Sequence, residues 1–203
     1  MKIFIDSAKI EEISSLYSAG IVDGVTTNPS LMKAAIEELQ VKSKKINLDS
    51  YIKQILRVAK GTPVSLEVTA TNYKDMVLQG KKIYKKYNPV ANNVYVKIPV
   101  NPAFSDETEE NYFDGIKTIK TLSRLKIPIN CTLIFTPMQA LLAAKAGAKF
   151  VSPFEGREED YIRKKFGIKF KKQDFYPKQG NRKKSDKGIV SGYDLIYQMK
   201  SLF

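Results

Sequence analysis

Short apolar runs alternate along this chain with longer segments in which apolar residues recur every three or four positions. The runs are rich in β-branched and aromatic residues, which is typical of buried strands. They lie at residues 2–5, 22–26, 63–68, 93–98, 127–135 and 150–153. The segments with helical spacing lie at residues 8–18, after 27–30, and at 49–60, 72–87, 107–125 and 137–147. Strands that alternate with helices build a parallel sheet, so the pattern predicts an α/β fold.

Polar residues mark where several of these helices should begin. Asp6 and Ser7 are predicted to cap the first helix, because their side-chain oxygens can accept hydrogen bonds from its first turn. Asn28 or Ser30 is predicted to cap the second. A last helix is predicted to start after Ser191. Its apolar face would hold Leu195, Ile196, Met199 and Leu202.

The apolar run that ends at Pro99 contains a lysine, Lys97, which is predicted to lie at the end of the strand. Removing an ammonium group from water is unfavourable, so its charge must be solvated, paired or given up. One interpretation is a lysine whose amine extends to water from the strand end. The other is a desolvated lysine with a lowered pKa, which can attack a carbonyl carbon and form a Schiff base.

Other polar residues occupy equivalent places at or just after the C-terminal ends of the predicted strands. In a closed (β/α) barrel those ends converge on one mouth, so the residues are predicted to share a site. Each also has a structural interpretation: Asp6 and Asn28 as helix caps, for example, or Glu67 as a solvated charge. The set comprises Asp6, Thr26, Asn28, Glu67, Lys97, Asn130, Thr132, Ser152 and Phe154.

Composition narrows the chemistry that such a site could perform. The 203 residues are enough for one domain, residues 1–203, with a full core. The chain has no histidine, which excludes Ser-His triads and His-ligated metals. The single cysteine, Cys131, has no internal partner, which favours a cytoplasmic protein. We find no signal peptide and no apolar run long enough to span a membrane.

The positive charge of the chain is concentrated in one segment. The formal net charge is +13, and residues 163–187 hold eleven Lys or Arg against two acids, a net of +9. Subtracting +9 from +13 leaves +4 for the rest of the chain. Basic residues mixed with aromatic ones can bind nucleic acid, but a solvated loop is the interpretation we favour, so a nucleic-acid partner is not expected.

Several motifs resemble the transaldolase family, in family order and at family spacing, over residues 1–158. The nearest form is the small microbial transaldolase, whose relatives include the fructose-6-phosphate aldolases. The matching stretches are 4–8 (FIDSA), 24–31 (GVTTNPSL), 96–99 (VKIP), 130–135 (NCTLIF), 139–148 (QALLAAKAGA) and 151–157 (VSPFEGR).

The resemblance implies a (β/α)8 barrel of the TIM-barrel type and a transferase of the pentose phosphate pathway. The family moves a dihydroxyacetone unit from fructose 6-phosphate or sedoheptulose 7-phosphate to erythrose 4-phosphate or glyceraldehyde 3-phosphate, without metal or cofactor. By resemblance, Lys97 is the Schiff-base lysine. Asp6, Glu67 and Thr132 are catalytic residues of proton transfer. The implied substrate-binding residues are Thr26, Asn28, Asn130, Ser152, Phe154 and Arg157.

The chain departs from the family pattern after residue 158. Residues 159–188 are predicted to form a basic insertion, and the chain stops before strands seven and eight of the implied barrel. A family arginine on strand seven, which holds the substrate phosphate, has no counterpart. We expect a truncated product, a chain completed by a second polypeptide, or a stable divergent form; a homo-oligomer is also open.

Two alternatives to transfer remain at this point. The first is fructose-6-phosphate aldolase activity, that is, cleavage without transfer. Glu67 and Phe154 favour transfer, because the aldolases of the family carry glutamine and tyrosine at these places. The second is a catalytically incomplete barrel remnant that binds a partner or nucleic acid.

Overall fold

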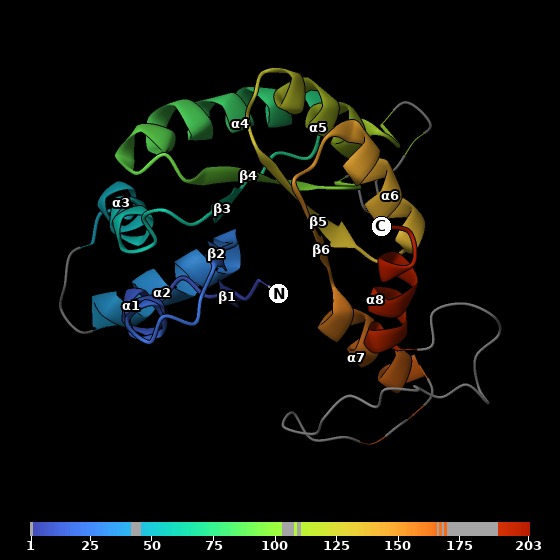
Figure 1. Ribbon diagram of the computed structural model, residues 1–203, viewed down its shortest axis with the longest axis horizontal. Coiled ribbons are helices and arrows are strands. Elements are labelled where there is room, and N and C mark those ends of the chain that lie inside the picture. The colour runs from blue at the N-terminus through green and yellow to red at the C-terminus, as the bar shows by residue number, and fades with distance from the viewer. Residues whose placement is uncertain are drawn as a thin grey trace.

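The computed structural model describes residues 2–41, 46–102, 108, 111–165, 167, 169 and 191–203. Six parallel strands pair in chain order to form one sheet. Figure 1 shows this sheet as a curved half-barrel with helices along its convex side. The predicted α/β fold is therefore confirmed, whereas strands seven and eight are not seen within the described ranges. The strands are β1 (Phe4–Asp6), β2 (Gly24–Thr26), β3 (Val64–Glu67), β4 (Val94–Pro99), β5 (Ile129–Ile134) and β6 (Phe150–Pro153).

The helices follow the strands closely in sequence, as expected for βαβ units. None of those described is long and apolar enough to cross a membrane. The predicted helix over 107–125 is described from residue 114 onward, and residues 103–107, 109 and 110 lie outside the described part. The helices are α1 (Ile10–Ser18), α2 (Pro29–Val41), α3 (Leu48–Val58), α4 (Tyr73–Tyr87), the 3-10 turn η1 (Asn88–Val90), α5 (Asp114–Arg124), α6 (Pro137–Ala146), α7 (Glu155–Lys165) and α8 (Gly192–Lys200).

The start of α1 differs from the prediction. The helix begins at Ile10, and its N-cap residue, Lys9, makes no side-chain capping bond. Asp6 is held in β1 opposite Thr26, so it lies too far from the helix to cap it. Ser7 accepts a hydrogen bond from the Lys9 amide at 3.1 Å, before the first turn. By contrast, Asn28 does cap α2, because its Oδ1 accepts from the Leu31 amide at 2.9 Å.

Helix α7 was not predicted, because residues 155–165 are charged and lack an apolar stripe. A buried ion pair replaces that stripe: Glu159 and Arg163 lie 3.3 Å apart, with 1% and 4% of their surfaces exposed. Glu159 also accepts the Gly192 amide at 3.1 Å and so ties α7 to the start of α8. The first residues of the predicted insertion are therefore a packed helix. Residues 166, 168 and 170–190 lie outside the described part.

The last predicted helix is confirmed as α8. Ser191 caps it by accepting a hydrogen bond from the Asp194 amide at 3.1 Å. Leu195 and Met199 are buried, as expected, but 37% of Ile196 and 45% of Leu202 are exposed. The apolar face is thus narrower than the sequence pattern indicated.

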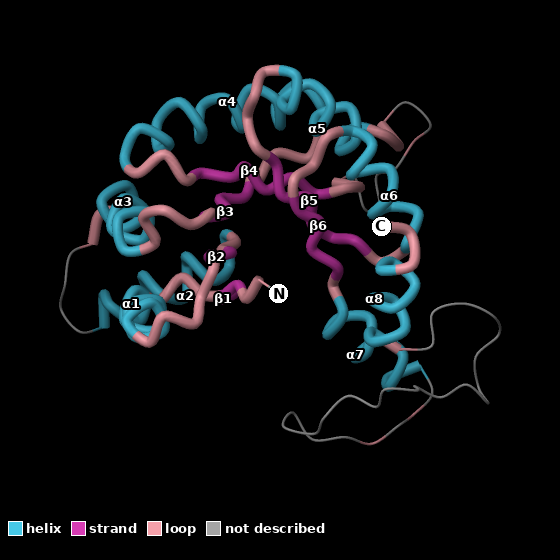
Figure 2. Tube along the Cα trace, viewed as in Figure 1, coloured by secondary structure: helices cyan, strands magenta, loops and turns pink. Residues whose placement is uncertain are grey.

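The two faces of the sheet differ in chemistry, because alternate side chains of a strand point to opposite sides. Val64, Val96 and Ile98 belong to the apolar core under the helices. The concave side holds an aromatic layer in which the Phe150 ring lies 5.2 Å from the rings of Phe4 and Tyr95. Figure 2 shows these strands on the inner side of an open arc of helices. Polar residues follow the aromatic ones along the same face, toward the C-terminal strand ends.

Gly115 allows the start of α5 to pack against the end of β4. A Cβ atom there would overlap the backbone carbonyl oxygens of Pro99 and Val100, which cannot turn away. We expect Gly115→Ala to lower the free energy of unfolding by about 1–3 kcal/mol, the usual cost of overpacking.

Urea unfolding measures this effect, and Gly80→Ala in α4 is the matched control. Its added Cβ would meet the flexible end of Leu122, with no backbone atom among the nearest contacts. In a helix interior, alanine is also more favourable than glycine by roughly 0.5–1 kcal/mol. Equal losses in the two variants would contradict this account of Gly115.

Candidate active site

Lys97 lies inside β4, two residues before the strand ends, and not at its end as predicted. It pairs in register with Glu67 of β3 on one side and Asn130 of β5 on the other. Its surface is only 4% exposed, so the lysine does not extend to bulk water. The amine donates a hydrogen bond to the Thr27 carbonyl oxygen at 3.3 Å and lies 3.5 Å from Glu67 Oε2. The structure therefore supports the interpretation of Lys97 as a desolvated, paired amine.

Glu67 faces Lys97 from the end of β3, and its electrostatics follow from that position. Burial raises the pKa of the Glu67 carboxyl above its ordinary value of 4.5. The charge of Lys97 and the hydrogen bond to it oppose the rise, and the negative charge of Asp6 adds to it. A carboxyl with a raised pKa holds a proton more readily than an ordinary carboxyl and can release it again. Glu67 is therefore suited to proton transfer at Lys97.

The raised pKa of Glu67 has a consequence for stability. Between pH 4.5 and the raised pKa, the folded chain binds more protons than the unfolded chain. The contribution of Glu67 is thus most favourable below pH 4.5 and is lost as the pH rises through the raised pKa.

We expect Glu67→Gln to flatten this part of the stability curve, because the amide does not titrate. Urea unfolding at a series of pH values from below 4.5 to neutral tests this. Glu37→Gln, which changes a carboxyl exposed on α2, is the control and should keep the parent's slope. A Glu67→Gln curve parallel to that of the parent would contradict the assignment.

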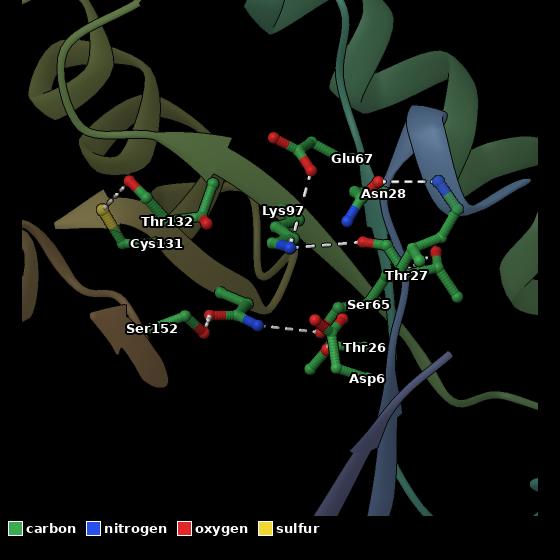
Figure 3. A network of polar contacts seen from close by, with 12 residues as sticks. Asp6, Thr26, Thr27, Asn28, Ser65, Glu67, Lys97, Cys131, Thr132 and Ser152 are labelled. Carbon is green, nitrogen blue, oxygen red and sulfur yellow. Dashed lines mark hydrogen bonds and ion pairs between the residues drawn. The ribbon is translucent and has the colours of Figure 1, made fainter. Parts of the chain in front are cut away.

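A chain of hydrogen bonds crosses the concave face beside Lys97 (Figure 3). Asn130 Nδ2 donates to Ser65 Oγ at 3.0 Å, and Ser152 Oγ donates to Asn130 Oδ1 at 2.8 Å. Thr26 Oγ1 of β2 donates to Asp6 Oδ1 of the edge strand β1 at 2.7 Å. These bonds orient hydroxyl, amide and carboxylate groups toward one space.

That space is a cavity of about 690 Å³ at the C-terminal strand ends. It is lined by all of the predicted site residues except Glu67 and Thr132. Glu67 instead contacts Lys97 from beside the cavity. The predicted residues that line the cavity are Asp6, Thr26, Asn28, Lys97, Asn130, Ser152, Phe154 and Arg157.

Thr132 is fully buried on β5, opposite Pro99 of β4. Its hydroxyl oxygen has no hydrogen-bond partner among the residues that the structure describes. The next residue, Leu133, adopts a φ of 58°, and the pairing of β5 with β6 is irregular at this point. Such bulges are frequent beside active sites, where they redirect a side chain. An unpaired buried hydroxyl is unfavourable, so Thr132 is suited to hold a water or a reacting group.

The structure adds residues that the sequence analysis missed. Ser65 stands two residues before Glu67, and strand alternation alone would have placed both on the same face. Phe4 and Phe150 close the floor of the cavity, and Glu155 and Asp160 line it from α7. Asp160 lies one helical turn after Arg157, so a carboxylate accompanies the arginine at this wall. Finding Asp160 required α7, which the sequence pattern did not indicate.

Two further groups bear on what the site can do. Within the described residues, no cluster of three or more Cys, Asp or Glu side chains is placed to hold a metal ion. Cys131 lies on β5 beside Thr132 but faces the apolar core. Burial raises the pKa of its thiol to about 12, so it is not a nucleophile at neutral pH. The Lys97 amine, by contrast, lines the cavity.

Comparison with known proteins agrees with this geometry. The family described as Transaldolase/Fructose-6-phosphate aldolase matches residues 3–201. A "Probable transaldolase" of Thermoplasma acidophilum is 48% identical over 160 residues, which cover 79% of this chain and 62% of the relative. A "Probable transaldolase" of Nitrosopumilus maritimus is 44% identical over 160 residues, 79% of this chain and 61% of the relative. The chain thus spans about three-fifths of the length of these relatives.

Among solved structures, a 2,3-dimethylmalate lyase of the PEP mutase/isocitrate lyase superfamily matches with a TM-score of 0.49 and 10% identity. The match covers 76% of this chain and 58% of that one. A likeness this low has no bearing on function. The family match extends over nearly the whole chain and includes the strands that carry Lys97 and its neighbours. The chain belongs to the transaldolase/fructose-6-phosphate aldolase family.

Proposed function

We propose that the chain is a transaldolase that moves a dihydroxyacetone unit between sugar phosphates through a Schiff base on Lys97. The observation that carries this proposal is the Lys97 amine itself. It is buried in the middle of a strand, lines the cavity, and lies 3.5 Å from the Glu67 carboxylate. A buried lysine beside a carboxyl able to exchange its proton is suited to attack a ketone. Since the chain spans only part of its relatives, its activity alone is part of the proposal.

Formation of the Schiff base begins with proton transfer from Lys97 to Glu67. The free amine attacks the ketone carbon of fructose 6-phosphate or sedoheptulose 7-phosphate and forms a carbinolamine. Glu67 then returns a proton to the carbinolamine hydroxyl, which leaves as water, and an iminium remains. Because both steps move a proton near the Lys97 nitrogen, the 3.5 Å separation from Glu67 is the relevant geometry.

The iminium next withdraws the electron pair of the C3–C4 bond, so that this bond breaks. Asp6 accepts the proton of the C4 hydroxyl as that carbon becomes an aldehyde. Thr26 donates a hydrogen bond to Asp6 Oδ1 and leaves Oδ2 available to face the substrate. The bound enamine then attacks erythrose 4-phosphate or glyceraldehyde 3-phosphate, and the same steps run in reverse. Asp6 returns the proton, so it acts as both base and acid.

The remaining predicted residues hold the sugar. Asn28 uses its Oδ1 to cap α2, so its Nδ2 is the atom that can donate to a substrate hydroxyl. Ser152, oriented by its bond to Asn130, offers a second hydroxyl contact. Arg157 lies in the first turn of α7, where a positive side chain and free helix amides both favour a phosphate group.

Transfer is favoured over simple cleavage by the residue at position 154. Phe154 lines the cavity, and its ring packs 5.6 Å from the ring of Phe135. Neither ring carries a hydroxyl that could help a water protonate the enamine. Cleavage without an acceptor requires that protonation, whereas transfer does not. The enamine should therefore persist until an aldehyde acceptor arrives.

A product assay tests this function. With fructose 6-phosphate and erythrose 4-phosphate, we expect sedoheptulose 7-phosphate, and no release of free dihydroxyacetone when the acceptor is omitted. Dihydroxyacetone as the main product without acceptor would assign cleavage instead. Failure of a folded chain to form either product would refute activity of this chain on its own.

The unpaired hydroxyl of Thr132 gives a second test. Thr132→Val keeps the side-chain shape and removes the hydroxyl, so the free energy of unfolding should stay unchanged or rise. Turnover should fall by about 10²-fold or more if this hydroxyl positions the water of proton transfer. Urea unfolding and steady-state kinetics measure the two effects. Loss of stability in proportion to activity would show that Thr132 has a structural role only.

A further inference from the structure

A second hollow, of about 570 Å³, lies between α2, α3 and α4, on the helix side of β2 and β3. We call it the α2–α4 groove. Met32 and Ile36 of α2 form part of its apolar wall, and Lys33 and Glu37 lie at its exposed rim. Polar side chains in its lining include Glu67 and Gln79.

Glu67 belongs to this groove and not to the substrate cavity. It is among the residues that line the groove, and it is absent from the described lining of the cavity. Asp6, by contrast, lines the cavity and is absent from the described lining of the groove. Asn28 borders both spaces and, with Lys97, separates them. The Glu67 side chain keeps 14% of its surface exposed, compared with 5% for Lys97, and this exposed part faces the groove.

Gln79 holds the part of the groove wall beside Glu67 in a fixed shape. Its Oε1 accepts hydrogen bonds from the amides of Thr69 and Ala70, both at 2.9 Å. Its Nε2 donates to Thr69 Oγ1 at 2.9 Å. These three bonds fix the loop that follows Glu67, so the opening beside the carboxyl is a built feature of the fold.

The proposed chemistry needs such an opening. When the carbinolamine loses its hydroxyl, the C–O bond breaks, the hydroxyl takes a proton from Glu67, and one water is released. Glu67 is then again the carboxylate with which the cycle began, and hydrolysis of the product iminium later consumes one water. During these steps the sugar is bonded to Lys97, which lines the cavity and contacts Glu67, so the sugar covers Glu67 on the cavity side. Exchange with solvent through the cavity is then blocked.

We propose that the α2–α4 groove is the route by which water leaves and reaches Glu67 while the sugar occupies the cavity. This inference rests on the proposed function, since it assigns the exchange to the Schiff-base cycle. It also implies that solvent reaches the two carboxyls of the site from different sides. Asp6 is reached from the substrate cavity, and Glu67 is reached from the helix side of the sheet.

Carboxyl labelling with a water-soluble carbodiimide and glycine ethyl ester tests the route. The chain is first reduced with borohydride in the presence of fructose 6-phosphate, and the adduct is verified by intact mass. In the chain that carries the adduct, labelling of Asp6 should be about tenfold lower than in the chain without it, because the ligand covers this carboxyl. Labelling of Glu67 should stay unchanged. A parallel fall at both residues would overturn the proposal.

A second arm of the experiment requires no Schiff base, so it tests the groove route independently of the Schiff-base function. In a Lys97→Met background, Ile36→Trp fills the groove, while Ala34→Trp adds the same bulk at an exposed site on α2 outside it. Glu67 labelling should fall in the first variant only, with Asp6 labelling equal in both. Equal Glu67 labelling in two folded variants would overturn the route.

If Ile36→Trp unfolds the chain, Glu37→Trp at the exposed rim replaces it, with the same expected fall. Absence of an adduct in the first arm would refute the Schiff-base function. The access of Glu67 through the groove would still be decided by the second arm.

Discussion

Replacing Lys97 by alanine should reduce transfer to background, a loss on the order of 10⁴-fold or more, as expected for removal of a covalent nucleophile. The buried amine is the group of the cavity that is able to form an iminium, and the thiol of Cys131 faces the apolar core. The substitution leaves Glu67 without its paired charge, but burial favours the neutral form of this carboxyl, so Glu67 can take up a proton and the variant should remain folded. Steady-state transfer from fructose 6-phosphate to erythrose 4-phosphate measures the effect.

Lys145→Ala is the control for this substitution. Lys145 is exposed on α6, away from the cavity, and its loss should leave the rate unchanged. Transfer by a folded Lys97→Ala variant at more than a small fraction of the parent rate would contradict the assignment of the nucleophile.

Glu67→Gln should lower kcat by about 10²–10⁴-fold, the range measured for general acid–base groups. Glutamine keeps the shape and the ability to accept a hydrogen bond from Lys97, but it does not carry the proton between the amine and the departing hydroxyl. Since the carboxyl does not line the substrate cavity, KM should change much less than kcat. Kinetics over a range of pH check both statements.

Glu37→Gln again serves as the control, because Glu37 is an exposed carboxyl at the groove rim. It should leave kcat and KM unchanged. A large rise in KM with unchanged kcat in Glu67→Gln would show that Glu67 binds substrate and does not transfer protons.

The main features of the fold could be predicted from hydrophobic periodicity. Strand alternation in 63–68 and 93–98 places Glu67 and Lys97 next to each other once the strands are parallel and in register, as observed. The gathering of polar residues at the strand ends follows from the same geometry. These inferences succeed because the sequence of a single strand already shows which of its residues are apolar and which are polar, and therefore which face is buried.

Features that depend on tertiary contacts could not be predicted in this way. Helix α7 is held against α8 by the bond from the Gly192 amide to Glu159, and no local pattern reveals this contact. The positive φ of Leu133 is imposed by the irregular pairing of β5 with β6. The predicted capping role of Asp6 was wrong, because its position in β1 directs the carboxylate toward Thr26. Local propensity was overridden in each case by contacts distant in sequence.

The division of the site between two spaces also required the structure. The sequence placed Asp6 and Glu67 in the same class, as strand-end carboxylates. Their access differs because α2 and α4 leave a groove beside β3, while Asp6 lies on the edge strand facing the cavity. The distinction between their two proposed roles therefore comes from packing.

The central claim is that the Lys97 amine forms a Schiff base with a ketose phosphate. Its most direct test is borohydride reduction of the chain with fructose 6-phosphate, followed by proteolysis and peptide mass mapping. The account predicts a ketose-derived mass increase on the peptide that contains Lys97, and none on that peptide without substrate. An adduct on a different lysine, or no adduct in a chain shown by circular dichroism to be folded, would contradict it.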